Sequence, residues 1–411
     1  MIEIKPKIVT LSNGLRFVYL HTTSPVAHLG ITFLAGSRYE KENEIGLAHF
    51  LEHCIFKGTS NRKPLQILSR LDNVGGELNA YTTKEEICIY ASFVNKHITR
   101  AADLLADIVI NSNFPEKEIE KEKEIVLDEL NSYMDNPSEK IFDDFEALLF
   151  PNHPLGNNIL GTPETVQSFN RSLLLDYVGR FFFAENAVVS YVGSASLKKV
   201  TALLEKQFAQ LPVGKPIEQP QPFQEQLILT KRLNESNYQA HAVLGGIAPG
   251  YGDESRRVMT LLINVLGGPA LNSRLNLSVR EKHGYSYTIE AHYSPFPDLG
   301  YWSIYFGSDQ KHLDKTLRIV YKEIEKLKTT PLTEKQLKVA KEQLKGHIAL
   351  SLDSNVGLMQ GLAKSLLLFN QIDSIEEIYA GIDNITSKAV QEVAISYFDT
   401  TKITSLIFDV K

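Results

Sequence analysis

The chain has 411 residues, which is long for a single hydrophobic core and predicts two domains. It is 43% hydrophobic and 22% charged, as in ordinary folded proteins, and its formal net charge of -6 without a basic block argues against nucleic acid as a partner. No signal-peptide core and no run of about 18 apolar residues is present, so we expect a cytoplasmic protein that does not enter a membrane.

The first chemical signal follows a predicted strand at residues 26–36. An apolar segment at 46–56 carries His49, Glu52 and His53. On a helix, positions four apart share a face, so both imidazoles can bind one ion, with Glu52 close enough to act as a base toward water. Two neutral nitrogen donors beside a carboxylate are typical of zinc hydrolases, and the order H-x-x-E-H indicates an inverzincin. The alternative is a helix whose histidines are ordinary surface or core groups.

Residues 79–82 come between a glycine turn at 75–76 and a predicted strand at 87–93. From the residues alone, a hairpin with ordinary turn chemistry is a reasonable interpretation.

The two cysteines, Cys54 and Cys88, are too few for a disulfide framework. Cys54 lies about 100° around the helix from His53, so we expect it to pack in the core and not to bind metal.

Zinc requires a third protein ligand, and a helix predicted within residues 114–133 offers one. Its inward stripe combines apolar and acidic positions at helical spacing: Ile119, Glu122, Val126, Glu129 and Tyr133. A carboxylate on such a face is costly unless it is paired or binds a metal. We therefore predict Glu129 as the third ligand and Glu122 as the group that orients a histidine. Asp128 and Glu124 project elsewhere and are expected on the surface.

A proline-rich segment divides the chain near its middle and predicts a linker at 213–224 between domains 1–212 and 225–411. The second half repeats the order of the first, with a predicted strand at 240–250 and an apolar helix at 258–266 that has no metal ligands. An internal duplication in which one copy kept the metal is the simplest account. Strands alternating with helices, such as 98–109 and 334–350, predict an α+β fold with two homologous α/β halves.

The chain resembles the pitrilysin family of inverzincins, in the branch that includes the mitochondrial processing peptidases. The resemblance is carried by residues 46–53, 56–59, 79–82, 120–129 and 153–156. It implies that each half is a duplicated α/β roll and that the zinc-bearing half is N-terminal, with an inactive, substrate-binding repeat in the C-terminal half. The family's third ligand falls on Glu129 and its further glutamate on Glu122, in agreement with the helical argument.

The resemblance also implies a set of substrate-binding residues. Asn79 would contact the substrate backbone, Ala80 and Tyr81 with Phe56 would line the pocket beside the cleaved bond, and the peptide would add to an edge strand. In the second half, the family's arginine and tyrosine fall on Arg280 and Tyr287. These two residues would hold the peptide and stabilise the oxyanion. For Arg280 alone, the alternative is a surface ion pair with a neighbouring acid.

The predicted activity is zinc-dependent endoproteolysis of peptides or unfolded segments, with one Zn²⁺ per chain and Glu52 as the general base. The resemblance implies a chamber closed by four halves. One chain would be half of that clamshell, and a homodimer would suffice, although a heterodimer with a related chain is also compatible. The alternatives are a catalytically silent or heterodimer-dependent scaffold subunit of the same family and a metal hydrolase that acts on small molecules.

Overall fold

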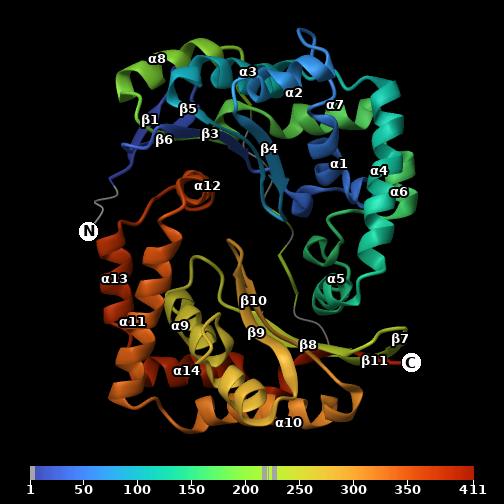
Figure 1. Ribbon diagram of the computed structural model, residues 1–411, viewed down its shortest axis with the longest axis vertical. Coiled ribbons are helices and arrows are strands. Elements are labelled where there is room, and N and C mark those ends of the chain that lie inside the picture. Colours follow the sequence, from blue (N-terminus) through green and yellow to red (C-terminus); the bar gives the residue numbers. More distant parts are fainter. Residues whose placement is uncertain (1–4, 215–219, 221, 225–228) are drawn as a thin grey trace. The chain divides into compact units, whose positions relative to one another are not determined.

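The protein is described by a computed structural model and forms two compact units (Figure 1). The first unit comprises residues 1–131, 157–221 and 351–374, and the second comprises 132–156, 222–350 and 375–411. The residues that the structure describes are 5–214, 220, 222–224 and 229–411. Part of the predicted linker, at 215–219 and 221, lies outside the described residues, and the division at 213–224 stays a prediction.

The first unit is built on a six-stranded sheet with the order β1-β2-β6-β3-β5-β4. Only the pairing of β2 with β6 is parallel within it. Its strands are β1 (Lys7–Thr10), β2 (Arg16–His21), β3 (Val26–Phe33), β4 (Glu77–Thr82), β5 (Ile87–Val94) and β6 (Ala187–Gly193). Its helices are α1 (Leu47–Cys54), α2 (Pro64–Asp72), α3 (Ile98–Asn111), α4 (Glu116–Met134, which runs into the second unit), α6 (Pro163–Ser168), α7 (Arg171–Phe181), α8 (Leu197–Gln207) and α12 (Asn355–Phe369).

Helices cover both faces of this sheet. Alternate strand residues such as Phe17 and Ile31 pack with α1, α2, α3, α7 and α8 in one core. Their neighbours, including Val18 and Val188, pack on the other face against α12. Because β6 lies between the two layers, all of its residues are buried. Strand β4 ends the sheet, so one of its edges has no partner strand among the described residues.

The second unit repeats this arrangement in a five-stranded sheet with the order β7-β11-β8-β10-β9. The parallel pair is β7 with β11, at the position that β2 and β6 hold in the first sheet. Its strands are β7 (Thr230–Glu235), β8 (Ala240–Ala248), β9 (Ser286–Pro295), β10 (Gly300–Ser308) and β11 (Thr404–Val410). Its helical segments are α5 (Pro137–Leu149), α9 (Arg256–Gly267), η6 (Asn276–Glu281), α10 (Gln310–Thr329), α11 (Glu334–Ser351), α13 (Ile375–Asp383) and α14 (Ser387–Tyr397).

Each half of the sequence contributes one helix to the unit that is built mainly by the other half. Helix α12, from the second half of the sequence, covers the first sheet at β3 and β6, whereas α5, from the first half, covers the second sheet at β8 and β11. The predicted α+β fold with two homologous halves is confirmed, because both sheets share one topology and one helix order. No helix in the described part of the chain is both long enough and apolar enough to cross a membrane.

Candidate active site

The two histidines of the motif lie on α1, a helix of eight residues. Gly46 precedes the helix in the left-handed region, with φ 94°, and a Cβ at this position would lie 2.5 Å from the Cα of Gly161. Only glycine fits this combination of backbone angle and close approach. Glu40 accepts hydrogen bonds from the backbone N–H groups of Gly46 (2.9 Å) and Ala48 (2.7 Å), and so satisfies donors at the start of the helix.

The expected third ligand reaches the histidines from α4. Pro115 comes directly before this helix, and Glu116 and Glu118 occupy its first turn, as expected for a helix N-terminus. Glu129 Oε2 lies 3.3 Å from His53 Nε2, and Glu129 Oε1 lies 3.9 Å from His49 Nε2. The helical spacing of the sequence therefore brings three side chains from two distant segments together.

These three side chains fit a zinc ion in kind and in spacing. His49, His53 and Glu129 each offer a ligand atom, and these atoms all lie within 4.8 Å of one another. Ligand atoms around tetrahedral zinc, about 2.1 Å from the ion, are roughly 3.4 Å apart, so only small side-chain movements are needed. Two imidazole nitrogens and one carboxylate oxygen are a donor set of catalytic zinc sites, in which water or substrate takes the fourth position.

The carboxylate of Glu122 lies beside one of the histidines. Its Oε2 lies 3.4 Å from His53 Nδ1, and its Oε1 lies 2.7 Å from the ammonium group of Lys57. The hydrogen bond to Glu122 raises the pKa of His53, and the other ring nitrogen, Nε2, faces Glu129. Burial lowers the pKa of His49 to about 4, so this imidazole is neutral at pH 7, as a metal ligand requires.

The expected inward stripe of α4 is buried along only part of its length. Ile119, Glu122 and Val126 are buried, whereas the Glu129 side chain is 45% exposed. The 3.6-residue period predicts which side of a helix faces inward, but it does not predict where the covering structure ends. Asp128 and Glu124 are exposed, as expected.

Glu52 lies on α1 next to His53 and contacts the hairpin of β4 and β5. Thr82, at the end of β4, donates a hydrogen bond of 2.6 Å from its hydroxyl to Glu52 Oε2. Burial raises the pKa of Glu52, and the bond from Thr82 acts in the opposite direction. The sequence reasoning missed this partner, although Thr82 belongs to the segment 79–82 on which the family resemblance rested.

The predicted substrate residues of the first unit have different surroundings. Asn79 is exposed on the edge strand β4, and Phe56 packs partly against the core that includes α1. Ala80 packs against the same core, but Tyr81 lies on the opposite face of the sheet, next to Tyr90. Adjacent strand residues point to opposite faces, so the structure does not bring Ala80 and Tyr81 into one pocket wall. Their binding roles stay predictions.

Arg280 and Tyr287 lie in the second unit, one in η6 and the other in β9. The Arg280 guanidinium lies over the Tyr287 ring, 4.9 Å from its centroid, and Tyr287 is 81% exposed. The arginine is also 3.8 Å from Glu281, the ion pair considered from the sequence. The predicted pairing of arginine and tyrosine is therefore present within this unit.

Cys54 packs in the core of the first unit, as expected from its place on the helix. Both cysteines are buried and free of disulfides, and burial raises the pKa of each thiol well above its ordinary value.

The second unit differs from the first as the sequence predicts. Where α1 and α4 meet through histidines and carboxylates, the corresponding helices α9 and α11 meet through a neutral hydrogen bond of 3.3 Å between Asn264 and Gln343.

This fold and this constellation resemble those of zinc metallopeptidases, and comparisons with known proteins place the chain in a family of that class. Residues 16–163 match the model for Insulinase (Peptidase family M16), and residues 168–344 match Peptidase M16 inactive domain. The chain is 34% identical to the zinc protease YmxG of Bacillus subtilis over 98% of both chains. It is 30% identical to mitochondrial-processing peptidase subunit beta of Bos taurus, over 95% of this chain and 81% of that protein.

Solved structures show the same fold at low sequence identity. A peptidase M16 inactive domain from Pseudomonas fluorescens has a TM-score of 0.92 at 19% identity, covering 99% of each chain. A protease from Helicobacter pylori has a TM-score of 0.91 at 22% identity, covering 99% of this chain and 100% of its own. The chain belongs to peptidase family M16, the pitrilysin family, in the branch of the mitochondrial processing peptidases.

Proposed function

We propose that the protein is a zinc-dependent endopeptidase that cleaves peptides or unfolded protein segments. His49, His53 and Glu129 would hold one Zn²⁺ per chain. The observation that carries this proposal is the convergence of these three side chains, with Glu52 beside them on the same helix. A scaffold subunit would have no need to keep all four groups, because an uncompensated cluster of buried and half-buried ionisable groups lowers stability.

The chemistry divides between the ion and the protein. Bound Zn²⁺ supplies a Lewis acid that polarises a carbonyl and activates water at neutral pH. Glu52 accepts the proton of the attacking water on a carboxylate oxygen and then passes it to the amine of the departing peptide. Thr82 holds Oε2 of this carboxylate, which leaves Oε1 available for the proton. Glu122 keeps His53 in the tautomer whose Nε2 can bind metal.

For the substrate, we propose that a peptide pairs with the edge of β4 in the first unit, and that Arg280 and Tyr287 have a substrate-binding role of their own in the second unit. An unpaired strand edge recognises main-chain groups, which supports broad sequence tolerance. The exposed aromatic ring of Tyr287, with a guanidinium stacked on it, offers both apolar contact and hydrogen-bond donors.

We also propose a homodimer, as the size of the chain and its family suggest. Light scattering on the purified chain tests the dimer.

The activity is tested with a quenched fluorogenic peptide and the full chain. We expect hydrolysis that a chelator abolishes and that added Zn²⁺ restores. Glu52→Gln keeps the shape of the side chain but removes its basic oxygen, so zinc should remain bound while turnover falls by at least about a hundredfold. The matched control is Glu124→Gln, a substitution at an exposed position of α4. The contrary result is wild-type protein that binds zinc and forms a homodimer but cleaves neither the fluorogenic peptide nor casein. That result would support the scaffold alternative.

A further inference from the structure

Lys57 occupies a special position next to the proposed metal site. It follows α1 by three residues, and its backbone N–H donates a hydrogen bond of 3.0 Å to the carbonyl of Cys54 at the end of that helix. Its ammonium group lies 2.7 Å from Glu122 Oε1 on α4. The Lys57 side chain therefore joins the histidine helix to the helix that carries Glu122 and Glu129.

Glu122 divides its two oxygens between two partners. Oε1 contacts Lys57, and Oε2 contacts His53 Nδ1 at 3.4 Å. The Glu122 side chain is only 4% exposed, so water cannot readily replace either contact. A buried carboxylate that loses its cation pays a large desolvation cost, and it relieves this cost by turning toward other partners or toward solvent. Either response weakens the contact that orients the His53 ring.

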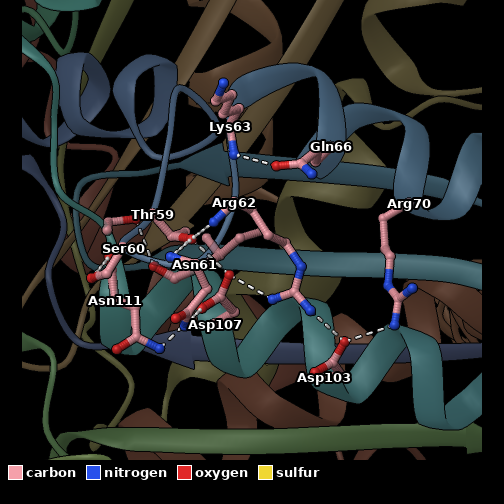
Figure 2. A network of polar contacts seen from close by, with 12 residues as sticks. Thr59, Ser60, Asn61, Arg62, Lys63, Gln66, Arg70, Asp103, Asp107 and Asn111 are labelled. Carbon is pink, nitrogen blue, oxygen red and sulfur yellow. Dashed lines mark hydrogen bonds and ion pairs between the residues drawn. The ribbon is translucent and has the colours of Figure 1, made fainter.

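The backbone around Lys57 is held in place on both sides. Gly58 adopts φ 144°, and its carbonyl accepts a hydrogen bond of 3.2 Å from the N–H of Asn113, just before α4. Thr59 donates a hydrogen bond of 2.8 Å to Asp107, on α3. Figure 2 shows this polar network, which ties the segment after Lys57 to α3. The ammonium group thus reaches Glu122 from a fixed backbone, so little further backbone freedom is lost when the ion pair forms.

We propose that Lys57 is a positioning residue that raises the affinity of the site for Zn²⁺ by holding Glu122 in the orientation that directs His53 Nε2 toward Glu129. This inference rests on the proposed function, because it assumes a zinc ion between the histidines and Glu129. An isolated surface ion pair would have little effect. Here one partner is buried and its second oxygen contacts a proposed ligand, so the ion pair acts on the metal site.

The test measures zinc affinity of the full chain by competition with a chromophoric chelator. Lys57→Met removes the charge and keeps the length of the side chain, and Lys57→Gln is a second neutral variant. We expect both to weaken zinc binding about tenfold, the lower end of the range for groups that orient a metal ligand. Lys57→Arg should restore most of the affinity. The control is Lys121→Met, because Lys121 forms an exposed ion pair with Glu118 at 2.7 Å on the same helix as Glu122.

Two further readouts separate positioning from a general loss of structure. The absorption spectrum of the Co²⁺-substituted protein should change in Lys57→Met and return in Lys57→Arg, because it reports on ligand geometry. In a Glu122→Gln background, Lys57→Met should cause no further loss of zinc affinity. Wild-type affinity in both neutral Lys57 variants, or a loss that simply adds to that of Glu122→Gln, overturns this inference alone. Absence of zinc binding by the wild-type chain overturns the proposed function as well.

Discussion

Asp107→Asn is expected to be one of the most destabilising changes of a single polar group in the first unit. The Asp107 side chain is 4% exposed and accepts hydrogen bonds from Thr59 (2.8 Å), Asn61 (2.6 Å) and Asn111 (3.0 Å), in addition to its ion pair with Arg62 at 2.6 Å (Figure 2). Asparagine has the same shape but carries no charge, and its amide group turns one acceptor into a donor. The variant therefore removes the buried counterion of Arg62 and leaves this guanidinium only the more exposed Asp103.

The magnitude follows from burial. Breaking a buried ion pair by removing one partner costs about 3–5 kcal/mol, whereas a partly exposed pair contributes about 0–1 kcal/mol. Asp103, one turn earlier on α3, provides the matched control, because it binds Arg62 (2.6 Å) and Arg70 (2.9 Å) but is 31% exposed. We expect Asp107→Asn to lower the melting temperature by roughly 6–20 °C and Asp103→Asn by at most about 4 °C.

The pH dependence gives a second test of the same reasoning. Burial raises the pKa of Asp107, but the hydrogen bonds from Asn61, Arg62, Thr59 and Asn111 outweigh burial and hold the pKa below its ordinary value of 3.8. A lowered pKa in the folded state stabilises the protein above pH 3.8, and this contribution is lost as the pH falls through the folded-state pKa. The gap in stability between wild type and Asp107→Asn should therefore narrow in acid.

Thermal unfolding by circular dichroism and hydrogen exchange of residues 59–62 measure these effects. The only tryptophan, Trp302, lies in β10 of the second unit, so its fluorescence reports on the unit that the substitution does not touch. Equal destabilisation by the two substitutions would refute the reasoning, because it would mean that burial does not decide the strength of these pairs.

Two further predictions concern the groups around α1. Burial raises the pKa of Glu40 to about 8, so the contribution of Glu40 to stability is present in acid and is lost as the pH rises through 8. The loss in free energy of unfolding caused by Glu40→Gln, measured in urea, should therefore shrink between pH 6 and pH 9. A constant or growing loss would contradict this. Thr82→Val removes the hydroxyl that binds Glu52 and should lower kcat/KM for a fluorogenic peptide about tenfold at unchanged zinc content. Unaltered kcat/KM would show that Glu52 needs no such support.

The metal centre could be predicted from local periodicity because its parts lie on two helices. His49 and His53 are one turn apart, and Glu122 and Glu129 are two turns apart, so each pair is fixed by helix geometry alone. That the two helices face each other was predicted from the inward-facing glutamates of α4, and the ligand spacing of the family agreed. The distances to Glu129 confirm that the two pairs meet.

Other features depend on tertiary structure and left no local signal. The helices α5 and α12 each cover the sheet built by the other half of the sequence, and their amphipathic patterns do not indicate which sheet they cover. Lys57 appeared only as part of the family segment 56–59, because its partner Glu122 is far away in sequence. Tyr81 could have been assigned to the face opposite Ala80 from strand alternation, but the family resemblance had grouped them together.

The central claim is that Glu129 completes a zinc site with the two histidines. It is tested most directly by zinc titration of metal-free protein, with bound metal measured by elemental analysis. The account predicts one Zn²⁺ per wild-type chain, binding that is weaker by at least about tenfold in Glu129→Gln, and unchanged binding in Asp128→Asn, the exposed neighbour on the same helix. Equal zinc affinity in Glu129→Gln and the wild type would contradict the account, since the site would then be built without this carboxylate.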